Sequence, residues 1–172
     1  MTALLVDDVV PFEDWSAAAR ASLAFLYRTV GLDVWMVTHV DEPHQFVLHS
    51  HPPEVIPQGA SIAWDRSFCR SMVSGEGPRV ATVTAATPAY RDLQTGLANR
   101  VAAYIGVPLV HRDGEVFGTL CGLSGRAQPR TLTRYLPLVE MTARMLSTLL
   151  STDDSAQRLV TSSAASMRDR PT

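Results

Sequence analysis

The sequence predicts an α+β protein in which helices from the two ends of the chain cover one face of a largely antiparallel sheet. Three observations support this fold class. Pairs of β-branched and aromatic runs are separated by short polar turns, as in β-hairpins. Apolar residues recur at helical spacing near both ends of the chain. In the second hairpin one face is almost purely aliphatic, which gives the helices a surface to cover.

The first predicted helix covers Phe12–Val30, where apolar residues lie three or four positions apart. Pro11 stands before this segment and Gly31 after it, and these residues are typical of the start and the end of a helix. Residues 1–11 are therefore expected to form an N-terminal extension.

Two strands are predicted next, Val34–Val40 and Gln45–His51, because both runs are rich in β-branched and aromatic residues. Residues 41–44 between them predict a hairpin with a four-residue loop. Residues 52–59 contain three prolines, so this segment is predicted to be a loop.

The middle of the chain predicts short elements. Asp65 is expected to cap a helix over residues 66–74, which Gly75 ends. Residues 79–83 predict a short strand. Residues 84–96 predict an ordered polar loop, with a helical turn near residues 93–99.

Residues 104–124, YIGVPLVHRDGEVFGTLCGLS, predict a second hairpin that turns at Asp113 and Gly114 in a two-residue type I′ turn. In that register the pairs on one face are Tyr104 with Leu123, Gly106 with Cys121, Pro108 with Thr119, and Val110 with Phe117. The opposite, aliphatic face holds Ile105, Val107, Leu109, Val116 and Leu120, with Gly118 and Gly122 between them. The aliphatic face is predicted to lie against the helices, and the mixed face is predicted to border a cavity.

A last helix is predicted to end at about Leu150, because apolar residues from Leu132 onward repeat at spacings of four and three. Pro137 is tolerated only if this helix starts near Thr131 or Thr133, so that the proline lies in the first turn. Residues 151–172 are rich in serine and polar, which predicts a flexible tail or linker. The domain is therefore expected to span residues 12–150.

Composition excludes several classes of protein. The 172 residues are 46% hydrophobic, which fits one globular domain, and no apolar run reaches the roughly 18 residues of a membrane span. The N-terminal MTALLVDDVV is acidic where a signal peptide is basic, so a cytoplasmic location is expected. The net charge of −2 is spread without a basic stripe, which argues against nucleic acid as a partner. Cys69 and Cys121 match no zinc motif, and whether they lie close enough to bridge is left open.

The stretch from Ser61 to Ser124 resembles the GAF domain family, in particular the bacterial members that precede diguanylate cyclase and histidine kinase modules. IGVPL at 105–109 and VFGTLCGL at 116–123 are similar to the last two strands of that family. The resemblance implies a profilin-like antiparallel sheet of five or six strands, terminal helices that pair in a homodimer, and a pocket with short helices on the other face. It also implies a sensory, regulatory role without catalysis.

Ten residues are candidates for contact with a small-molecule ligand. The expected pocket floor is formed by Tyr104, Phe117, Thr119 and Cys121, its wall by Phe68, Cys69 and Met72, and its lid by Tyr90, Arg91 and Asp92. The alternative for the apolar members is ordinary core packing, and for Arg91 and Asp92 a solvated surface.

Ligands of better-known relatives find little support in this sequence. The cyclic-nucleotide signature is absent, because Asn99 and Arg100 lack its downstream partners. Neither cysteine has a histidine neighbour, which disfavours a bilin, and the sulfoxide reductases of this fold use three cysteines where this chain has two. His39, His49 and His51 are a weak candidate for haem or a metal ion. No cofactor is assigned.

The expected function is a non-catalytic sensor module that binds an unknown small molecule. It would dimerise through Phe12–Val30 and Leu132–Leu150 and pass the occupancy of its pocket to a signalling partner or an output domain. The alternatives are a ligand-free GAF interaction or scaffold module with a collapsed pocket and, less favoured, a haem or redox sensor.

Overall fold

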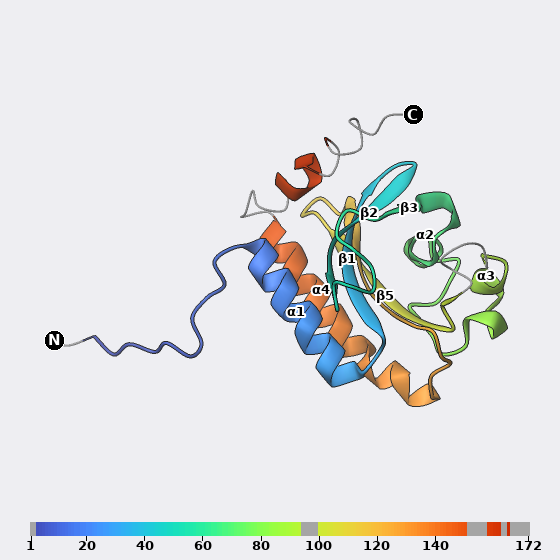
Figure 1. Ribbon diagram of the computed structural model, residues 1–172, viewed down its shortest axis with the longest axis horizontal. Helices are drawn as coiled ribbons and strands as arrows, with labels where there is room; N and C mark the ends of the chain where they lie inside the picture. The colour runs from blue at the N-terminus through green and yellow to red at the C-terminus, as the bar shows by residue number, and fades with distance from the viewer. Residues whose placement is uncertain (1–2, 94–99, 151–157, 163–164, 166–172) are drawn as a thin grey trace.

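A six-stranded sheet forms the centre of the molecule (Figure 1), as seen in a computed structural model that describes residues 3–93, 100–150, 158–162 and 165. The strand order is β3-β2-β1-β6-β5-β4, and every neighbouring pair is antiparallel. The strands are β1 (Val34–Asp41), β2 (His44–His51), β3 (Ser61–Ala63), β4 (Val80–Ala81), β5 (Ala103–Val110) and β6 (Val116–Ser124). The α-helices are α1 (Trp15–Val30), α2 (Phe68–Val73), α3 (Pro88–Arg91) and α4 (Leu136–Leu150). The α+β fold expected from the sequence is confirmed.

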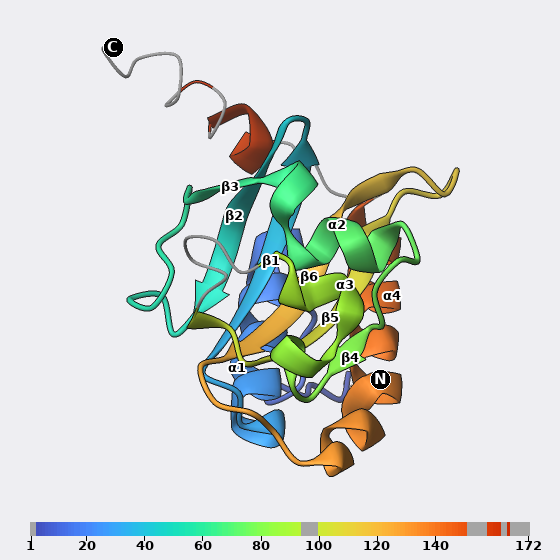
Figure 2. The same ribbon diagram turned by 90° about the vertical axis from the view of Figure 1, so that its right-hand side faces the viewer.

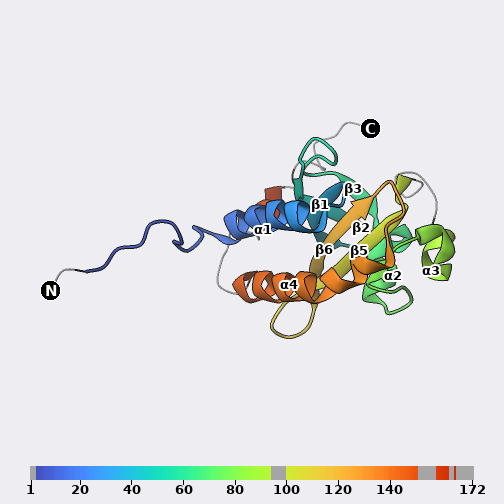
Figure 3. The ribbon, with the colours of Figure 1, turned by 90° about the horizontal axis from the view of Figure 1, so that it is seen from below.

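The sheet separates two layers of helices. Helices α1 and α4 lie side by side on one face, and the indole Nε1 of Trp15 in α1 donates a hydrogen bond of 3.0 Å to the carbonyl of Leu146 in α4 (Figures 1 and 3). Helices α2 and α3 lie on the other face (Figure 2). This arrangement gives the molecule a terminal-helix side and an α2 side, as the alternation in the second hairpin predicts.

Each side of the sheet has its own apolar core. The core on the terminal-helix side includes Trp15, Leu23, Leu26, Trp35, Val37, Ile105, Val107, Leu109, Leu120, Val139 and Leu146. The core on the α2 side includes Val34, Met36, Val47, Ile56, Phe68, Cys69, Met72, Tyr90, Tyr104, Cys121 and Leu123. Adjacent residues of the central strands belong to different cores because side chains alternate along a strand.

Helix α1 begins at Trp15, three residues later than predicted. The side chain of Asp14 accepts a hydrogen bond of 2.7 Å from the backbone N–H of Ala17, so Asp14 is the N-cap in place of the expected Pro11. Gly31 ends the helix with a φ of +80°, as expected.

The first hairpin has a shorter loop than predicted, because Asp41 pairs with His44 and leaves only Glu42 and Pro43 between the strands. The register shifts between Val37 and Thr38, which leaves Leu48 as the extra residue on β2. Gln45 and Val47 therefore face the α2 side, whereas Leu48 and His49 face the terminal helices.

The second hairpin has a three-residue loop in place of the predicted two-residue turn. Gly114 donates to the carbonyl of His111 at 3.0 Å, and His111 donates to the carbonyl of Glu115 at 2.8 Å. Gly114 has a φ of +89°, while no described non-glycine residue has a positive φ, which excludes a type I′ turn at Asp113. The loop is closed by the hydrogen bond from the Glu115 N–H to the Asp113 carboxylate, 3.0 Å.

A bulge restores the predicted register farther along this hairpin. Val110 pairs with Val116 and Leu109 with Gly118, so Phe117 is the extra residue. Beyond it, the predicted pairs of Pro108 with Thr119, Gly106 with Cys121, and Tyr104 with Leu123 are confirmed. The pair of Val110 with Phe117 is wrong, and Phe117 packs on the terminal-helix side. Val116, expected on that side, lies near α2 instead.

The middle of the chain is more regular than predicted. Residues 52–59 form a loop as expected, but β3 follows it and was not predicted. Helix α2 is capped by Ser67, not by Asp65, which lies in the 3-10 helix Trp64–Arg66. The predicted polar loop contains a 3-10 helix at Thr84–Ala86 and α3, and the predicted turn near residues 93–99 falls almost wholly outside the described residues.

The last helix begins with a 3-10 segment, Arg130–Tyr135, and continues as α4 from Leu136. Pro137 therefore lies in the first α-helical turn, as required. Residues 158–162 form a helical turn, and Leu159 and Val160 pack against the core on the terminal-helix side. Within the described ranges, no helix is both long and apolar enough to cross a membrane.

Candidate functional site

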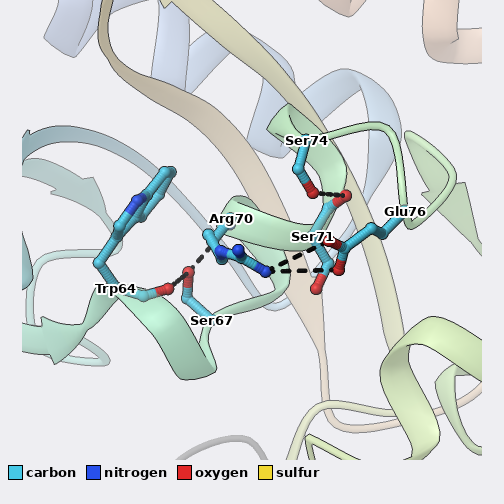
Figure 4. A network of polar contacts seen from close by, with 6 residues as sticks. All are labelled: Trp64, Ser67, Arg70, Ser71, Ser74 and Glu76. Carbon is cyan, nitrogen blue, oxygen red and sulfur yellow. Dashed lines mark hydrogen bonds and ion pairs between the residues drawn. The ribbon is translucent and has the colours of Figure 1, made fainter.

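Helix α2 has only six residues, and serine side chains and one ion pair hold it in place (Figure 4). The hydroxyl of Ser67 accepts from the N–H of Arg70 at 3.0 Å and donates to the carbonyl of Trp64 at 2.8 Å. Arg70 also reaches Glu76, 3.4 Å away and beyond the end of the helix. These contacts cap the helix and orient it over the sheet, so that Phe68, Cys69 and Met72 point inward.

A buried polar cluster lies between α2 and the sheet. Its centre is the sulfur of Cys69, which lies 3.8 Å from the sulfur of Cys121 on β6. The hydroxyl of Thr119 donates to the Cys69 sulfur at 3.3 Å, and the hydroxyl of Tyr104 donates to it at 3.6 Å. Cys69 is 2% exposed, and the other three residues are fully buried. Four of the ten predicted site residues therefore meet at one point.

Gly106 allows Tyr104 to reach this cluster. A side-chain Cβ atom placed on Gly106 would lie only 2.0 Å from the Tyr104 hydroxyl. The tyrosine therefore lies back along its own strand over a glycine, and a side chain at position 106 would displace it from Cys69.

The hydrogen bonds around Cys69 favour its thiolate. The hydrogen bond with Cys121 lowers the pKa of Cys69, against the opposing effect of burial, and the hydroxyls of Thr119 and Tyr104 lower this pKa further. The same hydrogen bond raises the pKa of Cys121, as does burial. Burial and the nearby Cys69 also raise the pKa values of Tyr90 and Tyr104, so both phenols stay neutral. In this arrangement Cys69 is the acidic thiol and Cys121 the donor.

The main pocket lies beside this cluster, between β2, β3 and the first residues of α2. Its volume is about 500 Å³. Most of its lining is apolar: Met36, Val55, Ile56, Pro57, Ala60, Ile62, Ala63, Phe68, Val101 and Leu123. The polar lining residues are Gln45, Ser61, Arg66 and Ser67. A mostly apolar cavity of this size with a few polar groups is typical of small-molecule sites.

Gln45 connects the pocket with the buried cluster. It lines the pocket, and its amide oxygen accepts from the Thr38 hydroxyl at 3.3 Å. The Thr38 hydroxyl lies 2.8 Å from that of Thr119, which in turn contacts Cys69. A continuous row of polar contacts thus runs from the pocket floor to the sulfur pair, and because each threonine hydroxyl has one proton, Thr38 and Thr119 cannot make all of these hydrogen bonds at the same time.

The predicted site residues divide among five places. Phe68 alone of the ten lines the main pocket. Cys69, Tyr104, Thr119 and Cys121 form the buried cluster, and Met72 and Tyr90 belong to the core beside it. Arg91 and Asp92 are exposed at 59% and 82% of their side chains and lie 3.8 Å apart. Phe117 lies on the opposite side of the sheet, 5.9 Å from the ring of Trp15.

Sequence reasoning missed most of the pocket, because its walls come from the proline-containing loop and from β3. Neither segment has a periodic pattern that assigns its residues to a face. Gln45 carries the one available signal: it shares the α2-facing side of β2 with Val47 and is a polar residue in an otherwise apolar set.

The three histidines considered for haem or metal lie on the terminal-helix side. The Nε2 atom of His49 lies 3.0 Å from the hydroxyl of Ser16, and the ring of His51 packs against Tyr27. His39 Nδ1 lies 2.9 Å from the carbonyl of Phe117. In the described part of the chain, no three His, Cys, Asp or Glu side chains come together as a metal site would require.

A family model for the GAF domain matches residues 14–150. The chain belongs to the GAF domain family. This match covers the sheet, both terminal helices and the pocket, and it confirms the resemblance seen at residues 61–124. GAF domains are a family of regulatory and sensor modules, and many of them bind small molecules.

Solved structures support the same fold. The free methionine-R-sulfoxide reductase of Neisseria meningitidis, solved with its substrate, is 20% identical, with a TM-score of 0.62 over 83% of this chain and 81% of that one. The GAF domain of the Acinetobacter phosphoenolpyruvate-protein phosphotransferase is 15% identical, with a TM-score of 0.60 over 82% of this chain and 84% of that one. The GAF-B domain of DevS from Mycobacterium smegmatis is 16% identical, with a TM-score of 0.57 over 81% of this chain and 96% of that one. At these identities the likeness concerns the fold alone.

No curated protein matches the chain.

Proposed function

We propose that this GAF domain is a non-catalytic sensor that binds a small, mostly apolar molecule in the pocket between β2, β3 and α2. The observation that carries the proposal is the pocket itself, which has a volume of about 500 Å³ and is lined by ten apolar and four polar residues. Such a lining stabilises an apolar body through burial and leaves few positions for polar atoms of a ligand.

The polar residues indicate a ligand with one polar or acidic end. Arg66 lines the pocket, and no described residue forms an ion pair with it. A carboxylate can accept two hydrogen bonds from a guanidinium, and Arg66 is the lining residue that carries a positive charge. We therefore assign short aliphatic or aromatic carboxylic acids as the ligand class, with the acid group toward Arg66.

The central strands offer a direct route from the pocket to the terminal helices. Met36 lines the pocket, while its neighbour Val37 belongs to the core under α1 and α4. In the same way Leu123 lines the pocket from β6, and Leu120 packs against the helices. A ligand that moves β1 or β6 therefore also moves the packing surface of α1 and α4.

The output of this sensor is proposed to leave through the terminal helices. Phe25 on α1 and Met141 and Met145 on α4 are exposed although they are large and apolar. Exposed apolar side chains on two adjacent helices are suited to a second copy of the chain. We place the protein in the cytoplasm, as a homodimer that passes its state to a signalling partner or an output domain.

Methyl-detected NMR tests the ligand proposal. Hexanoate and phenylacetate are titrated as probes, with hexanol and phenylacetamide as uncharged matches. We expect saturable shifts at the methyl groups of Met36, Ile56 and Leu123, and no primary shift at Leu23 or Leu26 on the other side of the sheet. Arg66→Gln is expected to weaken the acids about three- to tenfold and to leave the uncharged matches unchanged.

A filled pocket provides the control. Ala60→Phe places a ring in the cavity and is expected to abolish the shifts, whereas Ala86→Phe, at an exposed position in the 3-10 helix Thr84–Ala86, is expected to retain them. If none of the four probes binds saturably at these methyl groups, the ligand class is wrong and the ligand-free scaffold becomes the better reading.

A further inference from the structure

The sulfur pair beneath α2 has no part in the proposed ligand site. Cys69 and Cys121 are the two cysteines among the 172 residues, and both are reduced and buried. They come from elements that are 52 positions apart in the sequence, yet their sulfurs lie 3.8 Å apart. This proximity therefore results from the fold and not from a local motif.

We propose that Cys69 and Cys121 are a redox-active dithiol, which a hydroperoxide converts reversibly into an intramolecular disulfide. This inference does not depend on the pocket binding an acid. It concerns a covalent modification site with a hydroperoxide as the oxidant.

The geometry favours bond formation between these two sulfurs. A disulfide has a sulfur–sulfur distance of about 2.0 Å, so the two atoms must approach by about 1.8 Å. Cys121 lies on β6, a central strand paired on both sides, and can move little. Cys69 lies on α2, which has six residues and packs on the sheet through one side only, so the helix can supply the movement.

The surroundings of Cys69 make it the attacking group. The hydroxyls of Thr119 and Tyr104 donate hydrogen bonds to its sulfur, and the Cys121 thiol, 3.8 Å away, can donate to it once Cys69 loses its proton, so that a negative charge is stabilised there. The thiolate is the nucleophilic form of cysteine. The ionisable groups that face this sulfur are Cys121 from β6, Tyr104 from β5 and Tyr90 from α3, and none of them carries a competing negative charge at neutral pH.

The reaction balances with the hydroperoxide as the only co-reactant. The Cys69 thiolate attacks the terminal peroxide oxygen, the O–O bond breaks, and an alcohol, or water in the case of hydrogen peroxide, leaves with a proton from solvent. Cys69 is then a sulfenic acid. The Cys121 sulfur attacks the Cys69 sulfur, the S–O bond breaks, and water leaves with the Cys121 proton. Two electrons pass from the sulfurs to the peroxide, and a thiol reductant reverses the change.

The disulfide would also change the wall of the pocket. Ser67 and Phe68, directly before Cys69, line the pocket, and α2 must approach β6 for the bond to form. The aromatic group around the pair moves with it, because the ring of Phe68 packs 5.0 Å from Tyr90 and 5.7 Å from Tyr104. Oxidation is therefore a second input to the same part of the molecule.

Intact-mass analysis tests the proposal on the full chain. Reduced protein is exposed to hydrogen peroxide or cumene hydroperoxide, quenched in acid, unfolded and alkylated. Because the chain has two cysteines, an intramolecular disulfide gives a monomer lighter by two hydrogen atoms that takes up no alkylating agent. We expect this species as the main product, and we expect dithiothreitol to return it to the fully alkylated form.

Three variants separate the roles of the groups. Cys121→Ser should stop at a Cys69 sulfenic acid that dimedone traps, and Cys69→Ser should leave Cys121 unreactive. Thr119→Val removes a hydroxyl from the sulfur and should slow oxidation several-fold. Thr84→Val, at another buried threonine, removes a hydroxyl bonded to the Val101 carbonyl away from the pair and should not slow it.

The pH dependence gives a further readout that a merely structural cysteine pair would not produce. Because the hydrogen bonds lower the pKa of Cys69 below that of an ordinary thiol, the oxidation rate should rise with pH and level off at a lower pH than the rate of an unperturbed thiol. An unperturbed thiol would continue to gain rate above pH 8.

The proposal is overturned by any of three results. The first is two free thiols after prolonged exposure of folded protein to excess peroxide. The second is a disulfide that joins two chains. The third is independent oxidation of each cysteine to a sulfinic acid. None of these results bears on binding of the acid probes, so failure here and failure of the proposed ligand class can be told apart.

Discussion

At the scale of single residues, strand alternation decided which side chains could be predicted. Thr119 and Cys121 were expected on the face opposite Leu120, and they lie there because pairing with β5 fixes the alternation of β6. Phe117 was assigned to the wrong face, because a bulge adds one residue to the strand and reverses the direction of its side chain. Nothing in the local sequence marks that bulge.

The pocket residues illustrate the opposite case. Ile56 and Ile62 line the pocket from a loop and from a three-residue strand, and Arg66 lines it from a single 3-10 turn. Such short segments have no measurable periodicity, so their side chains can be assigned to a site only when the tertiary structure is known.

His49 should make the stability of the protein depend on pH. Burial lowers the pKa of His49 to about 4, and the positive charge of Arg20 lowers it further, against the effect of Asp14. The unfolded chain binds a proton at His49 below about pH 6.5, while the folded chain does so only near pH 4. The free energy of unfolding should therefore be unaffected by this group above pH 6.5 and fall by about 2–3 kcal/mol as the pH drops toward 4.

Urea unfolding of His49→Gln at several pH values measures this contribution. The variant should lose less stability than the wild type between pH 7 and pH 4.5. His44→Gln, on the same strand, is the matched control and should keep the wild-type dependence. Equal slopes for the wild type and His49→Gln would contradict the assignment.

At the scale of the elements, the sequence predicted the long helices and strands and also the short α2 and β4, but it missed β3 and α3. The helices α1 and α4 and the four long strands were all expected, because each contains several repeats of its period. The exact start of α1 depended on Asp14, and that of α2 on Ser67, since a single capping side chain decides where a helix begins. The strand β3 and helix α3 are three and four residues long, too short for a pattern.

An added methyl group should lower the free energy of unfolding by different amounts at the different glycines of the second hairpin. Gly114→Ala should destabilise the protein by about 1 kcal/mol, because the loop requires its φ of +89°. Gly118→Ala should cost clearly more, because its Cβ would lie 1.7 Å from the backbone oxygen of Thr38 and the strands would have to separate. The free energies of unfolding in urea give both values.

Gly125→Ala serves as the control for this series. Its Cβ would meet ordinary contacts, the nearest atom being the Arg100 carbonyl oxygen at 3.4 Å, and its stability should stay within about 0.5 kcal/mol of the wild type. A cost for Gly118→Ala no larger than that for Gly125→Ala would show that β1 and β6 are not as close as described.

At the scale of the whole molecule, the two-layered arrangement followed from one hairpin and two amphipathic helices. When one face of the sheet is aliphatic and two helices have apolar stripes, the helices are expected to pack with those stripes against that face of the sheet. The order of the six strands did not follow, because β4 and β3 at the two edges pair through contacts distant in sequence. The sequence therefore predicted the layers but not the complete sheet.

The exposed apolar residues of α1 and α4 predict a dimer, and charged substitutions at these residues should dissociate it. Met141 is 53% exposed and Met145 62% exposed. Replacing both with glutamate would bury charge in a helix-to-helix interface, so the double variant should be monomeric where the wild type is dimeric. Size-exclusion chromatography with light scattering measures the mass of each.

Val83→Glu is the control for a charge placed elsewhere. Val83 is also exposed, at 40%, but precedes the 3-10 helix Thr84–Ala86 away from the terminal helices, so its variant should keep the wild-type mass. A wild-type protein that remains monomeric at high concentration would contradict the proposed dimer.

The alternation of the central strands also bears on how such a protein can diversify. Met36 and Leu123 face the pocket, whereas Trp35, Val37 and Leu120 face the terminal helices. Selection can therefore exchange Met36 and Leu123 to suit a new ligand while the residues next to them keep the surface on which the helices rest. New chemical preferences and an unchanged output can be inherited on the same few strands.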